Sequence, residues 1–415
     1  MKQFEKLGLS HDILNALQEL EFETPTEIQE KSIPLVLAGK DIIAGSATGS
    51  GKTLAFASPI IENLKSNQKV QALVLTPTRE LAEQVASSIK LFSKHKHLKT
   101  TTIYGGVAIE PQIKHLRETD IVVGTPGRIL DHLQRGTLNL REVKFLVLDE
   151  VDRMFDMGFL RDVEKILYQC PKDRQTMLFS ATVSADIAHL ARRHTRNAVE
   201  VSVKSYVDPS KLKQYYYDVE DKFKFSLLVH LLKEESSELV MIFCGTRHKV
   251  DFVTKNLINS GVYAKAIHGG LSQNQRSAVL KDFHGKGVGV LVCTDVAARG
   301  LDIKGVSHVY NYDLPAVSND YIHRIGRTAR AGNDGKAVNL VSGSDYDNFN
   351  NILRDKQLNI ESMPLPNFNS VRVSVIERRG RFGNSGNRGG FRNNNSRGGN
   401  SGRRNFSGGN NRRRF

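Results

Sequence analysis

The sequence predicts an α/β protein built from two parallel-sheet domains in tandem, and three observations support this fold class. Short apolar runs recur along the chain, and they are continuous rather than alternating, as at residues 72–75, 239–243 and 288–293. Continuous runs are typical of strands that a parallel sheet buries on both faces. Small or polar residues and then a helical pattern follow these runs. The same pattern repeats after residue 215, which indicates a second domain of the same class.

The length of the chain also favours two domains, because 415 residues exceed what one compact core usually holds. Residues 204–211 lack apolar periodicity and form the natural linker. We therefore expect five segments: an N-terminal region at 1–30, a first α/β domain at 31–205, a linker at 206–214, a second α/β domain at 215–365 and a C-terminal tail at 366–415.

Composition excludes several classes of protein. The chain lacks an apolar run long enough to cross a bilayer, and its first eight residues lack the core of a signal peptide. Cys170, Cys244 and Cys293 lie far apart and show no metal-ligand spacing. We therefore expect buried thiols in a reduced compartment and a cytoplasmic protein.

Positive charge is concentrated at the C-terminus. The whole chain carries a net charge of +15, yet residues 378–415 contain eleven arginines and no acidic residue. The segment has almost no aliphatic residues, so it cannot bury enough apolar surface to fold. Its arginines and interspersed phenylalanines suit phosphate pairing and base stacking, which favours an RNA-binding tail over a merely solubilising one.

Residues 46–53 (SATGSGKT) predict a loop that binds nucleotide phosphates. A strand-like run precedes them, and a helical pattern follows at 54–57. Glycines let the backbone approach a phosphate, and the helix N-terminus directs N–H groups at the anion. Lys52 is expected to contact the outer phosphates, and the Thr53 hydroxyl to bind Mg²⁺. The expected ATP-binding residues of this loop are Ser46, Ala47, Thr48, Gly49, Ser50, Gly51, Lys52 and Thr53.

An acidic cluster follows another apolar run, at residues 143–148. A carboxylate at the C-terminal end of a buried strand can reach a metal ion held by the phosphate loop, so Asp149 is the predicted metal ligand. Glu150 is then placed to orient or deprotonate an attacking water. Such a cluster alone is more often a solvated turn, but together with Lys52 and Thr53 it predicts an NTPase site.

The second half of the chain has no Gly-Lys-Thr loop, so it must be structural or complete the site of the first domain. Residues 321–330 (YIHRIGRTAR) favour completion. Arg324, Arg327 and Arg330 are spaced by three, and on a helix they would share one face. Arginine there can stabilise charge on a transferring phosphoryl group. An exposed basic helix face is the alternative.

These motifs together resemble the DEAD-box family of ATP-dependent RNA helicases over nearly all of residues 1–365. The departures from the family pattern are few: Val151 replaces the alanine of the namesake motif, Ser46 replaces another alanine, and Glu21 and Ala329 replace glycines. The segments that carry the resemblance, in the order of the family, are 22–29 with Phe4 upstream, 46–53, 77–81, 105–106, 125–128, 149–152, 180–182, 242–246, 273–276, 294–302 and 323–330.

The resemblance implies two tandem RecA-like domains, ATP and Mg²⁺ as ligands, and a role for each matching residue. Gln29 would read the adenine edge, Phe4 would pack over the base, and Asp302 would contact the ribose. The remaining implied ATP contacts are Thr24 and Gly300. The implied catalytic residues are Lys52, Asp149, Glu150, Arg327 and Arg330, with the two arginines acting as arginine fingers. Polar coupling between the domains would rest on Asp152, Ser180, Thr182 and His323. The implied RNA contacts are Pro77, Thr78, Arg79, Gly105, Gly106, Thr125, Pro126, Gly127, Arg128, Gln273, Arg276 and Thr294.

The resemblance implies an enzyme that couples ATP turnover to backbone-directed RNA binding, local unwinding of short duplexes or remodelling of RNA–protein complexes. We expect a monomeric core, with ribosomal precursors or the RNA-turnover machinery as partners. Two alternatives stay open at this point: an RNA clamp or annealing protein that unwinds little, and a DNA translocase. A signalling or transport NTPase is disfavoured, because the motifs of the second half would then have no explanation.

Overall fold

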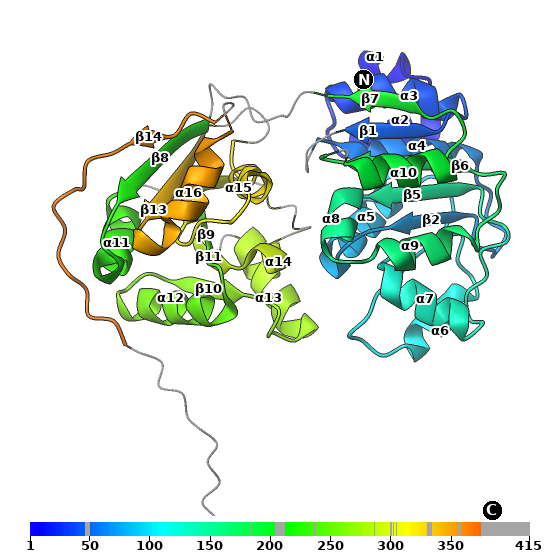
Figure 1. The fold of residues 1–415 in the computed structure, drawn as a ribbon. Coiled ribbons are helices and arrows are strands. Elements are labelled where there is room, and N and C mark those ends of the chain that lie inside the picture. The colour runs from blue at the N-terminus through cyan, green and yellow to red at the C-terminus, as the bar shows by residue number, and fades with distance from the viewer. Residues whose placement is uncertain are drawn as a thin grey trace, which may run out of the picture. The chain divides into compact units, whose positions relative to one another are not determined.

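The chain forms two seven-stranded sheets, and the pairings between described strands are all parallel (Figure 1). This confirms the predicted fold class. The computed structural model describes residues 1–45, 50–182, 184–203, 212–235, 238–285, 287–298, 301, 303, 305–329, 334–355 and 358–374.

The first sheet has the strand order β3-β4-β2-β5-β6-β1-β7. Its strands are β1 (Ile42–Gly45), β2 (Ala72–Leu75), β3 (Thr100–Ile103), β4 (Ile121–Gly124), β5 (Phe145–Asp149), β6 (Gln175–Ser180) and β7 (Val199–Ser202). The helices of this part of the chain are α1 (Lys2–Glu5), α2 (His11–Glu19), α3 (Glu27–Leu37), α4 (Lys52–Asn63), α5 (Arg79–Phe92), α6 (Glu110–Leu116), α7 (Pro126–Gln134), α8 (Val151–Asp156), α9 (Leu160–Leu167) and α10 (Ala185–His194).

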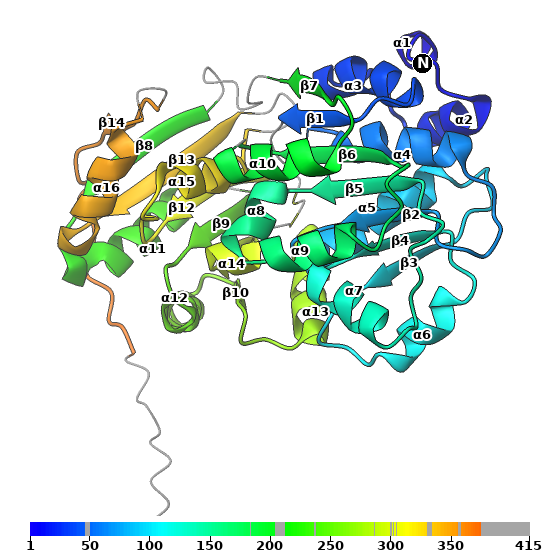
Figure 2. The ribbon, with the colours of Figure 1, turned by 45° about the vertical axis from the view of Figure 1, so that its right-hand side comes forward.

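Both faces of the first sheet are covered, as the continuous apolar runs predict. In β2, Ala72 and Val74 belong to one hydrophobic core, while Leu73 and Leu75 belong to another. The first core includes side chains of α2 to α5, and the second includes side chains of α7 to α10. Figure 2 shows α9 and α10 on the same face of the sheet. Successive side chains of a strand point to opposite faces, so burial of all four β2 residues requires helices on both.

The second sheet has the order β10-β11-β9-β12-β13-β8-β14. Its strands are β8 (Leu212–Asp218), β9 (Leu239–Phe243), β10 (Ala264–Ile267), β11 (Val290–Cys293), β12 (Val306–Asn311), β13 (Gly335–Val341) and β14 (Glu361–Ser362). Its helices are α11 (Lys224–Glu234), α12 (Arg247–Asn259), α13 (Gln273–His284), α14 (Asp295–Ala298), α15 (Ser318–Ile325) and α16 (Tyr346–Leu353), with short 3₁₀ turns η1 (Asp221–Phe223) and η2 (Gly343–Asp345).

Two of the predicted segment boundaries are wrong. The predicted linker included residues 212–214, but these residues begin β8 and pair with β13. The predicted tail began at residue 366, but residues 363–374, which we call the strap, bond to the second domain. The rest of the predicted tail, 375–415, and most of the predicted linker lie outside the described residues.

The strap is held by aromatic packing and by hydrogen bonds from three of its residues. The ring of Phe368 lies 6.4 Å from that of Phe223 and 6.1 Å from that of His230. The backbone of Ser374 donates to Asn256 Oδ1 at 2.7 Å and accepts from Asn256 Nδ2 at 3.2 Å. Sequence patterns missed the strap because its alternating pairs, Met363 with Leu365 and Val371 with Val373, are too short to predict a strand.

An ionic cluster centred on Glu235 joins the end of α11 to β12 and β13. Its carboxylate accepts from Lys336 Nζ at 2.5 Å and lies 3.0 Å from His308 Nε2. The Tyr310 hydroxyl donates to the same carboxylate at 3.1 Å. Burial alone would raise the pKa of Glu235, but bonds to His308 and Lys336 outweigh it and lower the pKa to about 2.

Among the described helices, none is both long and apolar enough to span a membrane.

Candidate active site and nucleic-acid interface

The phosphate loop lies between β1 and α4, as predicted. Residues 46–49, which include four of the predicted ATP contacts, lie outside the described residues. Gly51 caps α4 with a left-handed φ of 92°, and Lys52 begins the helix. A Cβ at Gly51 would lie 2.5 Å from Gln29 Nε2 and 2.9 Å from Thr26 Oγ1. Glycine is therefore required there both for its φ and for space.

The Q-motif residues bind the backbone of this loop directly. Gln29 is 1% exposed, and its Nε2 donates to Gly51 O at 3.0 Å. Its Oε1 accepts from Thr26 N at 3.0 Å, which forms a capping box at the start of α3. Thr26 Oγ1 donates to Ser50 O at 2.7 Å. Any ligand that bonds to the Gln29 amide thus acts on the loop that holds Lys52.

Two other predicted ATP contacts, Phe4 and Thr24, differ in their exposure to solvent. Phe4 is fully buried in the core of the first domain, with its ring edge-on to that of Phe22 at 6.4 Å. In this arrangement its ring is covered by protein, so packing over a base would require the covering side chains to shift. Thr24 is exposed on the loop before α3.

The acidic cluster lies at the end of β5, beside the phosphate loop. Asp149 is 3% exposed, and its Oδ1 lies 3.7 Å from Lys52 Nζ. Burial raises the pKa of the Asp149 carboxyl to about 6, against the opposing effect of Lys52. Asp149 Oδ1 is buried without a hydrogen-bond partner among the described residues. Glu150 adopts a left-handed φ of 53° and caps α8. The two acids are therefore held in place where β5 turns into α8.

The structure brings together three of the four predicted coupling residues. Asp152 Oδ2 accepts from the backbone N–H groups of Ala181 and Thr182, both at 3.1 Å, and from Thr182 Oγ1 at 3.3 Å. Ser180 Oγ accepts from Asp152 N at 3.3 Å and donates to Thr182 O at 2.6 Å. This network joins the start of α8 to the end of β6. The fourth residue, His323, lies on α15.

The predicted RNA contacts of the first domain gather at the ends of β2, β3 and β4. A Cβ at Gly106 would lie 2.1 Å from Arg79 Nη1, so the Arg79 guanidinium lies directly against this glycine, whose φ is 80°. Arg128 Nη2 donates to Val107 O at 3.1 Å. Thr78 caps α5 by accepting from Leu81 N at 3.3 Å. The remaining predicted residues of this edge are Pro77, Gly105, Thr125, Pro126 and Gly127, at the strand ends and helix starts named above.

The predicted RNA contacts of the second domain lie on α13 and just before α14. Arg276 Nε lies 2.8 Å from Glu80 Oε1, and Gln273 Nε2 donates to the same oxygen at 3.4 Å. Arg276 also donates to Ala297 O at 3.4 Å. The guanidinium is thus already paired, and binding of a phosphate there would compete with Glu80. Thr294 is 9% exposed and precedes α14.

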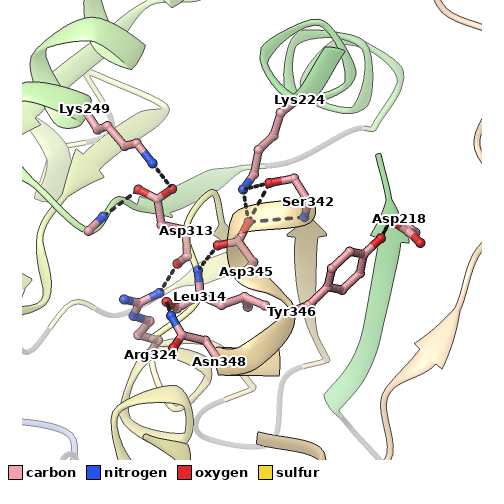
Figure 3. Close-up of polar contacts among 11 residues, drawn as sticks. Asp218, Lys224, Lys249, Asp313, Leu314, Arg324, Ser342, Asp345, Tyr346 and Asn348 are labelled. Carbon is pink, nitrogen blue, oxygen red and sulfur yellow. Dashed lines mark hydrogen bonds and ion pairs between the residues drawn. The ribbon is translucent and has the colours of Figure 1, made fainter. Parts of the chain in front are cut away.

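The prediction that three arginines share a helix face is wrong. Helix α15 ends at Ile325, so Arg324 is the one of the three that lies within it. Its guanidinium is buried and bonds bidentately to Asp295, at 2.5 and 2.6 Å. Arg324 also donates to Asp313 O at 2.6 Å (Figure 3). Its role is therefore to join α15 to α14 and to the loop after β12.

Figure 3 shows the polar network around Arg324. The Asp313 carboxylate accepts from Gly245 N at 2.8 Å and from Lys249 Nζ at 2.6 Å. Close by, Lys224 Nζ lies 2.5 Å from Asp345 Oδ2. The network ties the loop after β9 to the segment that leads into Arg327.

The two predicted arginine fingers follow α15. Arg327 is 2% exposed, and its Nη1 donates to Leu301 O. Ala329, which stands where the family pattern has glycine, adopts a left-handed φ of 53°. Arg330, together with the predicted nucleotide contacts Gly300 and Asp302, lies outside the described residues.

Four residues of the site were missed by the sequence reasoning: Thr26, Glu80, Arg153 and Asp295. A signal existed for Thr26, because threonine three residues before glutamine at a helix start is a capping-box pattern. A signal also existed for Arg153, because it follows Glu150 at the i,i+3 spacing of helical ion pairs. Glu80 and Asp295 act through contacts distant in sequence, which no local pattern encodes.

Comparison with known proteins agrees with this geometry. The DEAD/DEAH box helicase family matches residues 26–190, and the helicase conserved C-terminal domain matches residues 223–332. The chain is 45% identical over 370 residues to the DEAD-box ATP-dependent RNA helicase CshA of Geobacillus kaustophilus, covering 88% of this chain and 79% of that one. It is also 45% identical to a probable ATP-dependent RNA helicase of Methanocaldococcus jannaschii, covering 87% and 97% of the two chains.

Among solved structures, S. cerevisiae Dbp5 bound to RNA and ADP BeF3 matches with a TM-score of 0.79 and 32% identity, covering 88% of this chain and 96% of that one. The two sheets are thus tandem RecA-like domains. The chain belongs to the DEAD-box family of ATP-dependent RNA helicases.

Proposed function

We propose that this helicase uses ATP binding and hydrolysis to grip RNA by its backbone, to separate short duplexes locally and to remodel RNA–protein complexes. The observation that supports this most is the meeting of Lys52, Asp149 and Glu150 where β1 and β5 end. Asp149 lies 3.7 Å from Lys52, and Glu150 is the next residue. Ligands of open α/β sheets bind at this edge.

In the proposed reaction, Glu150 accepts a proton from a water whose oxygen attacks the γ-phosphorus of ATP. The new P–O bond forms as the bond to the bridging oxygen breaks, and ADP leaves with the electron pair. Lys52 holds the outer phosphates, while Arg327 and Arg330 stabilise the charge that develops during transfer. An arginine finger contributes about 10³–10⁵ in rate in well-studied NTPases.

The residues present fit a Mg²⁺ ion bound together with the phosphates. Asp149 Oδ1 is a buried acceptor without a hydrogen-bond partner among the described residues, and Thr53 lies in the first turn of α4. No group of three potential metal ligands occurs among the described residues, and Mg²⁺ held with substrate phosphates needs only one or two protein ligands. Bound there, Mg²⁺ would neutralise charge on the phosphate oxygens.

Nucleotide choice is proposed to rest on Gln29. A glutamine amide can pair with the N6 donor and N7 acceptor of adenine, whereas guanine presents two acceptors at those positions. Since Gln29 Nε2 also donates to Gly51 O, adenine binding would act on the phosphate loop. Equal activity with GTP in the unmodified protein would contradict this assignment.

RNA is proposed to bind along the edge formed by Arg79, Gly106, Thr125 and Arg128, with Arg276 and Thr294 contributing from the second domain. Arginines and backbone N–H groups at helix starts are suited to phosphates rather than to base edges. Binding should therefore depend little on sequence. The eleven arginines of residues 378–415 are proposed to add affinity.

The test compares ATPase activity and strand separation on matched substrates. RNA, but not DNA of the same sequence, should stimulate ATP turnover, and short RNA duplexes should be separated in an ATP-dependent manner. Stimulation by DNA would favour a translocase, and turnover without strand separation would favour an RNA clamp or annealing protein. Glu150→Gln should abolish turnover while ATP and RNA binding persist, and Arg327→Ala should lower turnover with near-normal ATP binding.

Truncation after Glu377 tests the tail. Single-stranded RNA binding loses about 0.7 units of log–log salt slope per neutralised phosphate, so loss of a partly engaged tail should flatten the slope by about 2–4 units. ATP turnover at saturating RNA should barely change. Unchanged affinity and slope would assign the tail to solubility or to protein partners. Crosslinking and sequencing of bound RNA in cells, with fractionation of those cells, would test the proposed ribosomal or RNA-turnover role and the cytoplasmic location.

A further inference from the structure

Arg153 is a buried arginine beside the residue proposed to activate water. It lies on α8, one turn after Glu150, and is 2% exposed. Its Nε lies 3.4 Å from Glu150 Oε2, and the two side chains are 2% and 4% exposed. The pair is therefore shielded from solvent, where an ionic contact is both strong and demanding in its geometry.

Two of the three guanidinium nitrogens of Arg153 are unsatisfied. Nη1 and Nη2 are buried without a hydrogen-bond partner among the described residues. Arg174, another buried arginine of the same domain, has one such nitrogen, Nε, but its Nη1 donates to the carbonyls of Cys170 and Pro171 at 3.5 and 2.6 Å. An arginine cannot lose its charge in a protein, so burial of Arg153 with open donors opposes folding.

Glu150 itself carries a further unfavourable feature. Its φ of 53° is left-handed, a conformation that non-glycine residues rarely adopt. Two residues one helical turn apart thus both oppose stability. Such features persist where function requires them.

The neighbouring carboxylates of Asp149 and Asp152 do not explain why an arginine is buried at position 153. Asp149 already faces Lys52 Nζ at 3.7 Å, and Asp152 accepts bonds from the backbone of Ala181 and Thr182. The carboxylate that Arg153 contacts is that of Glu150. The contact is an ion pair of 3.4 Å to one carboxylate oxygen, Oε2, and no hydrogen bond joins Arg153 to that oxygen. The charge of Arg153 therefore attracts one side of the carboxylate more than the other.

We propose that Arg153 is a positioning residue for Glu150: by attracting Oε2 through its charge, it orients the carboxylate so that Oε1 faces the attacking water. The inference rests on the proposed role of Glu150 as the base. Arg153 takes no proton and touches neither ATP nor water. Its effect on hydrolysis passes through Glu150.

The experiment measures single-turnover ATP hydrolysis at saturating RNA for the full chain and four variants: Arg153→Gln, Arg153→Lys, Glu150→Gln and the double variant Arg153→Gln/Glu150→Gln. Loss of a partner that orients a reacting group typically costs about 10–100-fold in activity. We expect Arg153→Gln to lower kcat by about that factor, with the KM for ATP within about threefold. Arg153→Lys should recover part of the rate, because lysine keeps the charge but not the planar donor geometry.

The double variant separates positioning from a structural role. If Arg153 acts through Glu150, adding Arg153→Gln to Glu150→Gln should change the residual rate by less than about twofold, since coupled residues are not additive. A structural role would lower the rate by the same factor in both backgrounds and would overturn the proposal. Unchanged kcat in both Arg153 variants would overturn it as well.

Arg174→Gln serves as the matched control, because it removes a buried arginine of the same domain away from the acids. It should lower the thermal midpoint without changing kcat at temperatures where the protein stays folded. If Arg153→Gln does not fold, Arg153→Lys alone decides: a lowered kcat at normal ATP binding supports positioning, and a normal kcat overturns it. Ordinary turnover by Glu150→Gln would instead remove the base assignment itself, and the inference with it.

Discussion

The buried ion pair between Lys224 and Asp345 gives a quantitative test of the second domain. Its atoms are 2.5 Å apart, and the side chains are 4% and 6% exposed. The same carboxylate accepts from Ser342 Oγ at 2.8 Å and from Leu314 N at 3.3 Å, so it also organises the loops after β12 and β13 (Figure 3). Replacement of Lys224 by methionine keeps the apolar stem of the side chain but leaves a buried carboxylate without its cation.

The expected loss follows from that uncompensated charge. Removal of one partner of a buried pair costs about 3–5 kcal/mol in the free energy of unfolding. For a domain of this size, about 1 kcal/mol shifts the midpoint by roughly 2–4 °C, so Lys224→Met should lower the melting temperature of the second domain by about 6–20 °C. The double variant Lys224→Met/Asp345→Leu should recover part of the loss, because it removes the lone charge as well.

Lys222 provides a control only two residues away. It pairs with Glu220 at 2.7 Å, but the two side chains are 67% and 68% exposed. Solvent weakens such a pair, so Lys222→Met should shift the midpoint by only about 1–2 °C. Calorimetry of the two single variants and the double variant, with urea unfolding followed by circular dichroism, measures these differences.

The pH dependence adds a second check. Burial alone would raise the pKa of Asp345, but Lys224 and the hydroxyl of Ser342 hold it below its usual value. A carboxyl with a lowered folded-state pKa contributes stability that is present above the unfolded pKa and lost as pH falls through the folded one. The gap between wild type and Lys224→Met should therefore be largest near neutral pH and shrink below about pH 4. A variant as stable as wild type at pH 7, or a gap that does not shrink in acid, would refute this account of the pair.

The phosphate loop, the Glu235 cluster and the left-handed Glu21 each allow a further test. Gly51→Ala should raise the Kd for ATP by at least about tenfold, because a Cβ would lie 2.5 Å from Gln29 Nε2 at a φ of 92°. Fluorescent-nucleotide titration measures this change. The control is Gly343→Ala, where no atom lies within 4 Å of the added Cβ. Glu235→Gln should destabilise the second domain at pH 7. The stability difference between wild type and variant should fade as pH falls from about 4.5 towards 2, since the pKa of Glu235 is lowered to about 2. Equal differences in urea midpoint at pH 7 and pH 3 would contradict this prediction. Glu21→Gly should raise the thermal midpoint of the first domain by about 1–3 °C, because relief of left-handed strain exceeds the added chain entropy; a lower midpoint in calorimetry would count against strain at this position.

The strands that sequence reasoning found form short apolar runs, whether they lie inside a sheet, as β2 does, or at its edge, as β10 does. Residues 72–75 and 264–267 form β2 and β10 with the predicted bounds. β3 was missed because three of its four residues are threonine, so it forms no apolar run. β8 was missed because only two of its seven residues are buried, and they do not alternate regularly with the exposed and partly buried ones. Its neighbour β14 has only two residues, so most of β8 faces solvent on one side of the strand.

The chemistry of the site was predictable because it depends on which residues end the parallel strands, and strand ends meet at one sheet edge. The contacts that orient those residues were not. The pairing of Arg324 with Asp295 spans 29 positions, and that of Arg276 with Glu80 spans 196. Such contacts depend on how helices pack rather than on local periodicity. Local spacing also does not show where a helix ends: the spacing of Arg324 and Arg327 predicted a shared helix face, but α15 ends at Ile325.

The two positions where this chain lacks a glycine of the family pattern, Glu21 and Ala329, both have a positive φ, of 58° and 53°. The family pattern therefore encodes backbone geometry at these sites, and this chain keeps the geometry at the expense of strain. The consequences of the strain differ, because the surroundings differ. Glu21 is exposed at the end of α2, so its strain falls on one helix terminus. Ala329 is buried against the start of β13, where a Cβ on Gly335 would lie 2.5 Å from Ala329 N. Relaxation of the turn at 329 would also move β13, and the turn lies two residues from Arg327, the proposed arginine finger. We therefore expect strain at Ala329 to affect the placement of that arginine, and strain at Glu21 to affect stability alone.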